Sequence, residues 1–155
     1  MRSPLESVLP GITVHIAVIS AWAELLNYEE RCRPKRSITR LFCSVNMLNE
    51  NDYMSTEKIR ATTFAENMES VLLSADVKNI RDMSLVFVPV LHDEHLYCVC
   101  FNLRDNKVDV LDNNIADVSF KGKYNERPEK LVRSFFYKLQ MSFVNILKHK
   151  CLMIA

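Results

Sequence analysis

The sequence predicts an α+β fold in which helices pack around a small, mainly antiparallel sheet. Apolar side chains recur at helical spacing over residues 13–30, 55–73 and 128–148. From Ser84 to Asp112 the spacing changes to that of β-strands. The chain has 155 residues, of which 48% are hydrophobic, and it shows no internal repeat and no long linker. We therefore expect a single domain over residues 1–155.

The first predicted helix covers residues 13–30 and follows the helix-breaking pair Pro10-Gly11. Its polar side chains share one stripe and its apolar side chains the opposite one (Thr13, Ser20, Glu24 and Asn27 against Ile12, Ile16, Ile19, Ala23 and Leu26). The apolar run is shorter than the roughly 20 residues that a membrane-spanning helix needs. An amphipathic helix packed on a core is therefore expected, in place of a signal peptide or a membrane anchor.

Residues 31–40 carry several basic side chains around Pro34. Two interpretations stay open: a solvated connection, or a basic patch for nuclear import or for an acidic partner. Residues 40–45 have the composition of a short strand. The second helix, over residues 55–73, begins where Ser55 and Thr56 can cap it, and one of its faces is apolar.

Three strands are predicted in the central part of the chain. The continuous apolar run over residues 85–90 is typical of a strand buried on both faces, with Pro89 near its end because proline has no backbone N–H to donate. Residues 95–103 and 107–112 predict two further strands. The turn residues Arg104-Asp105-Asn106 between them indicate an antiparallel hairpin.

Charge and cysteine content restrict the functional classes. Twenty basic and nineteen acidic side chains leave a formal charge of +1, so a dedicated nucleic-acid binder is not expected. The cysteines are odd in number and irregularly spaced, which favours reduced thiols and a nuclear or cytoplasmic location (Cys32, Cys43, Cys98, Cys100 and Cys151). With only two glycines, the chain has no Gly-rich phosphate loop.

A histidine and an aspartate stand at neighbouring ends of the predicted hairpin. His95 opens the second strand and Asp112 closes the third. The start of one antiparallel strand and the end of its partner lie at the same edge of the sheet, so we expect the two side chains to meet there. An imidazole oriented by a carboxylate can act as a general base, although most such pairs near strand ends have no catalytic role.

A zinc site is the competing interpretation, because His92, His95, Cys98 and Cys100 lie close together in the sequence. Strand alternation argues against it: His95 shares a face with Tyr97, whereas both cysteines share the opposite face. Free cysteines in an apolar strand usually pack as small hydrophobic residues. We therefore expect no metal and no cofactor, and neither Cys98 nor Cys100 is expected to be a nucleophile.

Residues 85–114 resemble the central segment of the ubiquitin-like-protein-specific (SUMO/sentrin-type) cysteine protease family, particularly its diverged plant branch. In that family an F-x-P-V-like strand end precedes a catalytic histidine, and an I-L-D-N-like sequence carries a catalytic aspartate. Residues 86–90, His95 and residues 110–113 match these pieces in the same order. Upstream, residues 20–27 and 40–42 resemble the D-A-W-x-x-L-L-N-like helix and the R-L-F segment of plant members.

The resemblance implies a papain-like cysteine peptidase fold, with His95 as general base and Asp112 as its orienting carboxylate. Two departures matter. Leu96 stands where the family has a tryptophan that lines the channel for a Gly-Gly tail. No D-C-G nucleophile, with its oxyanion-hole glutamine, follows Asp112, and Cys151 is followed by Leu152 instead of glycine. We therefore expect an incomplete domain that lacks the nucleophile and is inactive alone.

The predicted domain has three parts: a helical part over about 12–75, a sheet with the His–Asp pair over about 84–114, and a helix over about 128–149. By resemblance, the function is cysteine-type hydrolysis at ubiquitin-like (SUMO-type) modifiers or deconjugation of them. The expected partner is such a modifier or its conjugates, with neither nucleic acid nor membrane as partner. The alternatives are a catalytically dead protein-binding remnant, or a truncated product without an independent role.

Overall fold

The computed structural model describes residues 14–34, 37–112 and 120–139, and it has the predicted α+β architecture. Five α-helices and four strands occur in the described part, with short 3-10 turns at Val45–Met47 and Ile80–Asp82. The helices are α1 (Ile16–Arg31), α2 (Glu50–Met54), α3 (Glu57–Ser74), α4 (Phe120–Tyr124) and α5 (Arg127–Leu139). The strands are β1 (Arg40–Phe42), β2 (Leu85–His92), β3 (His95–Asn102) and β4 (Lys107–Leu111).

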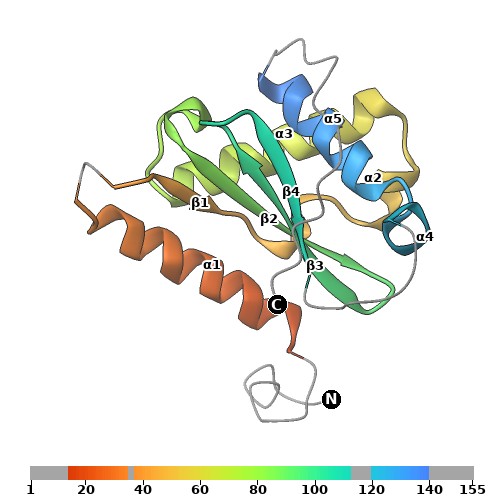
Figure 1. The fold of residues 1–155 in the computed structure, drawn as a ribbon, viewed down its shortest axis with the longest axis horizontal. Helices are drawn as coiled ribbons and strands as arrows, with labels where there is room; N and C mark the ends of the chain where they lie inside the picture. The colour runs from red at the N-terminus through yellow and green to blue at the C-terminus, as the bar shows by residue number, and fades with distance from the viewer. Residues whose placement is uncertain (1–13, 35–36, 113–119, 140–155) are drawn as a thin grey trace.

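The four strands form one sheet in the order β1-β2-β3-β4 (Figure 1). β1 pairs with β2 in parallel, whereas β2–β3 and β3–β4 are antiparallel hairpins. The prediction of a mainly antiparallel sheet is therefore confirmed. α1 packs beside β1, and α3 and α5 pack against each other across the sheet from α1 (Figure 1).

The core lies between the sheet and the pair α3–α5. Alternate residues of β3, namely Tyr97, Val99 and Phe101, are buried on this side because successive side chains of a strand point to opposite faces. The ring of Phe101 stacks on Phe135 of α5 with centroids 3.8 Å apart, and Phe64 of α3 packs against the same ring. In the described residues, the predicted apolar faces of both helices are thus covered by the sheet and by each other.

Pro89 lies within β2, not near its end as predicted, since the strand continues to His92. The neighbour strand explains why this is tolerated. The Phe87 carbonyl accepts a hydrogen bond from the Cys43 N–H, at the point where β1 ends. Residue 89 directs its backbone nitrogen to the same side, where no described strand follows. The missing N–H therefore costs no ladder hydrogen bond.

Asn27 is buried, although its place on the polar stripe of the first helix predicted an exposed side chain. Its Nδ2 donates to the Phe42 carbonyl oxygen at 2.8 Å, and its Oδ1 accepts from the Phe42 N–H at 2.9 Å. The amide side chain thus makes the two hydrogen bonds that a neighbouring strand would make with β1, and it links α1 to the sheet. Several apolar side chains of α1, such as Trp22 and Leu25, are instead exposed.

Local sequence signals account for the helix starts. Thr56 caps α3, as predicted, by accepting from the Ile59 N–H. Asn49 and Asp52 form a reciprocal capping box at α2, a helix that the periodicity did not predict because it is only one turn long. For the last predicted helix, residues 140–148 lie outside the described residues. No helix in the described ranges is both long and apolar enough to cross a membrane.

We predict that Asn27→Ala lowers the free energy of unfolding by about 2–4 kcal/mol, because two backbone groups of Phe42 lose their partner inside the protein. Urea denaturation followed by circular dichroism measures this change. Glu24→Ala, one turn earlier and exposed, is the matched control and should stay within about 0.5 kcal/mol of the wild type. Equal denaturation midpoints for the two variants would contradict the role given to Asn27.

Candidate active site

His95 is the first residue of β3, directly after a tight turn. His92 and His95 are cross-strand partners, and Asp93 and Glu94 form the two-residue connection between them. Both connecting residues have positive φ, 46° and 63°, as a type I′ hairpin turn requires. Such a connection matches the twist of the flanking strands. It therefore fixes the position of His95 at the rim of the sheet.

Asp112 comes directly after β4, where Leu111 pairs with Cys98. One residue further along, the antiparallel register brings Asp112 beside Tyr97, diagonal to His95 on the same face of the sheet. The Asp112 side chain is 2% exposed and that of His95 is 29% exposed. The structure thus brings the two predicted residues together: His95 Nε2 lies 2.9 Å from Asp112 Oδ2.

Two further groups reach the same carboxylate oxygen. Lys123 Nζ lies 2.8 Å from Asp112 Oδ2, and the Tyr124 hydroxyl donates to it at 2.6 Å. Both residues belong to α4, and Figure 1 shows this helix on the same side of the molecule as the turn between β2 and β3. An ionised carboxylate only accepts hydrogen bonds, and each of these three partners can donate one. The site is therefore consistent with a charged Asp112 carboxylate.

This arrangement determines the tautomer of His95. Because the carboxylate accepts, the neutral ring carries its proton on Nε2. Nδ1 then has the lone pair, and no hydrogen bond joins Nδ1 to another group within the described part of the chain. An imidazole with one nitrogen anchored and the other available has the geometry of a general base.

Aromatic side chains enclose the pair from the core. The Tyr97 ring lies beside the His95 ring, with centroids 6.2 Å apart, and packs against the Tyr124 ring at 4.8 Å. Tyr97 and Tyr124 are almost completely buried. They restrict the imidazole on one side and keep water from the carboxylate, which strengthens its hydrogen bonds.

None of the described thiols meets His95. Cys32 is exposed at the end of α1, and Cys43 is buried just after β1. Cys98 and Cys100 lie on the sheet face opposite to Tyr97, as strand alternation predicts. Burial raises the pKa of Cys98 to about 12 and that of Cys100 to about 11. These thiols are therefore poor nucleophiles. Cys151 lies outside the described residues.

The same alternation separates the candidate zinc ligands, since His95 faces the core side and both strand cysteines face the other side. Within residues 14–34, 37–112 and 120–139, no group of three or more His, Cys, Asp or Glu side chains is arranged to hold a metal ion. His92 is half-buried, with its Nδ1 3.5 Å from an Asp93 carboxylate oxygen. Its neighbour is thus the turn and not the cysteines.

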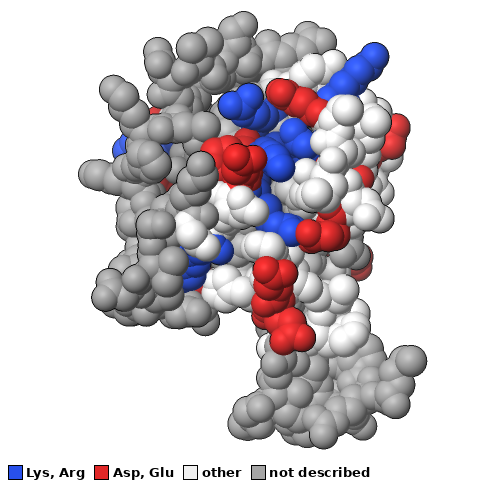
Figure 2. Space-filling view, turned by 90° about the vertical axis from the view of Figure 1, so that its right-hand side faces the viewer, with Lys and Arg blue, Asp and Glu red and all other residues white. Residues whose placement is uncertain are grey.

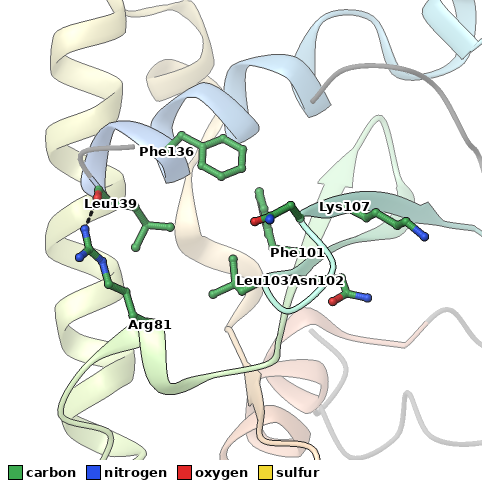
Figure 3. A pocket seen from close by; sticks show the side chains of 8 residues that line it. Arg81, Phe101, Asn102, Leu103, Lys107, Phe136 and Leu139 are labelled. Carbon is green, nitrogen blue, oxygen red and sulfur yellow. Dashed lines mark hydrogen bonds between the residues drawn. The ribbon is translucent and has the colours of Figure 1, made fainter. Parts of the chain in front are cut away.

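A cavity of about 350 Å³ lies at the opposite end of β3, around the turn to β4 (Figure 3). Its walls are mainly apolar (Phe101, Leu103, Phe136 and Leu139). The Arg81 guanidinium at its rim donates to the Leu139 carbonyl oxygen at 2.8 Å, and Figure 3 shows Lys107 pointing away from it. The polar side chains that Figure 3 labels at this cavity do not converge on one point, as they do in a typical small-molecule site.

The face around α2, α4 and α5 carries charges of both signs. Figure 2 shows acidic and basic side chains beside one another on its described part, without a broad field of either sign. Ion pairs on and between these elements join Glu50 to Arg127 and Glu126 to Lys130. Arg127 is buried beneath this face and lies over the Tyr53 ring. Ligand recognition here would rest on local pairs more than on net charge.

Sequence reasoning missed Lys123 and Tyr124. They follow Asp112 by about a dozen residues, in a segment without helical periodicity or a recognisable motif. Local patterns report which face of an element is buried, and they do not report which loop returns to a given strand end. Only the three-dimensional arrangement shows that α4 lies against the end of β4.

Solved structures of SUMO proteases match the fold of this chain. The SUMO protease Ulp1 with its catalytic cysteine oxidised to a sulfenic acid matches with a TM-score of 0.68 at 9% identity, covering 97% of this chain and 60% of that one. The C-terminal Ulp1 protease domain in complex with Smt3, the yeast ortholog of SUMO, matches with 0.61 at 8% identity, covering 97% and 58%. A de-sumoylating protease matches with 0.54 at 10% identity, covering 90% and 53%.

At these identities the likeness establishes the fold alone. The chain has the α+β fold of the Ulp1 protease domain, as predicted, and it spans about 60% of the length of the Ulp1 structures. No protein-family model matches the sequence, and no curated protein matches it either. The roles of His95 and Asp112 therefore rest on the geometry of this chain together with its sequence motifs.

We predict that iodoacetamide at about pH 8 modifies exposed Cys32 in the native protein but leaves Cys43, Cys98 and Cys100 unmodified. Burial raises the pKa of all three, so their thiolate forms are scarce at this pH. Peptide mapping by mass spectrometry identifies the modified positions, and the urea-unfolded chain is the control in which every cysteine reacts. Modification of native Cys98 or Cys100 as fast as Cys32 would contradict the assignment of inert thiols.

Proposed function

We propose that this chain provides the base-bearing part of a cysteine-type peptidase or isopeptidase that acts on SUMO-like modifiers. The observation that carries the proposal is the 2.9 Å contact from His95 Nε2 to the buried Asp112 carboxylate, with no hydrogen bond to Nδ1 from any residue that the structure describes. His95 is the general base and Asp112 the orienting carboxylate. The fold shared with SUMO proteases supports the substrate class. The motifs around Trp22, Arg40 and Asp112 support the plant-like branch.

In the proposed reaction, Nδ1 of His95 takes the proton of a cysteine thiol, and the thiolate attacks the carbonyl carbon of the scissile bond. The imidazolium then returns the proton to the leaving amine, and water hydrolyses the resulting thioester. Asp112 stays ionised and stabilises the imidazolium. Since no described thiol lies against His95, we propose that the chain alone does not turn over these substrates.

The proposed partner is a ubiquitin-like modifier of the SUMO type or its conjugates, in a nuclear or cytoplasmic setting. One of the matching Ulp1 structures is a complex with Smt3. In this chain Leu96 follows the base where the family has tryptophan, and it lies half-buried on the outer face of β3. Leucine is smaller than tryptophan and would bury less surface against an extended tail. We therefore expect this chain to bind the tail more weakly. Retained binding without hydrolysis is the alternative function.

For activity, we predict no hydrolysis of a SUMO–coumarin amide by the purified chain above the uncatalysed rate, because a base without an adjacent thiolate supplies little acceleration. Release of the fluorophore is the measurement, with an active SUMO protease as positive control. Cys151→Ala and His95→Ala are the diagnostic variants. Turnover that survives Cys151→Ala and disappears in His95→Ala would refute inactivity and point to another nucleophile.

For binding, we predict that the full chain binds immobilised SUMO and that His95→Ala leaves this binding within about twofold, because His95 would be one of many contact residues in a protein–protein interface. Biolayer interferometry measures the affinity, and urea unfolding is recorded in parallel. Binding without turnover supports the protein-binding remnant. A chain that neither binds a SUMO-type modifier nor unfolds cooperatively would exclude both functions and favour a product without an independent role.

A further inference from the structure

The α4 helix delivers two donors to one oxygen of Asp112. Lys123 and Tyr124 are consecutive residues, and they reach Oδ2 at 2.8 Å and 2.6 Å, the atom that also contacts His95. The Tyr124 ring is fixed in the core by its packing on Tyr97. The Lys123 ammonium lies 5.4 Å from the centre of the Tyr124 ring and is mostly shielded from solvent, with 13% of the side chain exposed.

We propose that Lys123 and Tyr124 are positioning residues of the His95–Asp112 pair, with separable roles. Tyr124 fixes the orientation of the carboxylate, and Lys123 offsets its charge so that the resting imidazole stays neutral. Their meaning for catalysis rests on the proposed function above. Neither residue was singled out by the sequence motifs, and neither is a catalytic residue, since each acts on the base only through Asp112.

The physical argument concerns the charge seen by the imidazole. A buried carboxylate beside a histidine favours the doubly protonated ring. An ammonium group on the same oxygen opposes this, because it lies within two hydrogen-bond lengths of His95 Nε2. The neutral ring keeps its lone pair on Nδ1, which is the form that can accept a proton. Tyr124, a neutral donor, changes this balance less than Lys123 does.

Other ionisable groups that the structure describes around His95 come from its own strand, from the turn and from the elements behind Tyr97. On its own strand the neighbour is Tyr97, and across the hairpin it is His92. The turn residues Asp93 and Glu94 are exposed, so solvent and salt screen their charges. Behind the Tyr97 ring lie Tyr53 of α2 and the α5 residues Arg127 and Glu129.

The test reads the ring nitrogens of His95 by long-range ¹H–¹⁵N NMR on the ¹⁵N-labelled full chain at neutral pH, with His95→Gln to assign the signals. In the wild type we expect a neutral ring with the proton on Nε2. Lys123→Gln keeps a donor without the charge, and it should raise the ratio of imidazolium to neutral ring by about three- to tenfold. Lys123→Arg keeps the charge and should retain the wild-type signals. Tyr124→Phe should produce a smaller rise.

Lys130→Gln is the matched control, because Lys130 pairs with Glu126 away from Asp112, and it should leave the His95 signals unchanged. A folded Lys123→Gln variant with unchanged ring signals would overturn the proposal. So would a wild-type ring that is already doubly protonated, a result that needs no variant to fold. The readout involves neither modifier nor thiol, so failure of the peptidase proposal leaves it standing, and its own failure does not affect the binding and turnover results.

Discussion

The site depends on a carboxylate that is kept charged below the surface. Removing a carboxylate from water costs several kcal/mol unless hydrogen bonds and an opposite charge replace the lost hydration. Among the described residues, Asp112 receives these from His95 at the start of β3 and from Lys123 and Tyr124 of α4. Because Asp112 needs these partners, the start of β3 and the end of β4 are joined to α4, a helix that follows later in the sequence. It also explains why the imidazole has a defined orientation although 29% of the side chain is exposed.

Much of this arrangement follows from short-range sequence patterns. A two-residue turn between apolar strands makes β2 and β3 a hairpin, and Arg104-Asp105-Asn106 does the same for β3 and β4. Once both hairpins form, the pairing register of β3 and β4 places Asp112 next to His95. The helix α3 could be predicted in the same way, since its capping residue and its apolar face are both defined by residues close together in the sequence.

What escaped prediction depends on partners far away in the sequence. Asn27 fits a polar helix stripe, and only the position of β1 turns it into a buried hydrogen-bonding group. Pro89 is compatible with the middle of β2 because β1 ends before reaching it. Lys123 could equally have been a solvated lysine, and nothing in its neighbours indicates a buried carboxylate nearby. In each case the role of the residue depends on a neighbouring helix or strand. The hydrophobic periodicity around the residue gives no information about that neighbour.

The pleat of β3 also separates reactive from inert groups. Residues of one parity, His95 and Tyr97, face α4 and the polar site, where charged partners are available. Residues of the other parity, Cys98 and Cys100, face an apolar environment that raises the pKa of both thiols. A shift of one residue in register would exchange the two sets, placing thiols beside Asp112 and the imidazole in the apolar layer. The two short turns that fix the register of β3 therefore decide which of its side chains can take part in proton transfer.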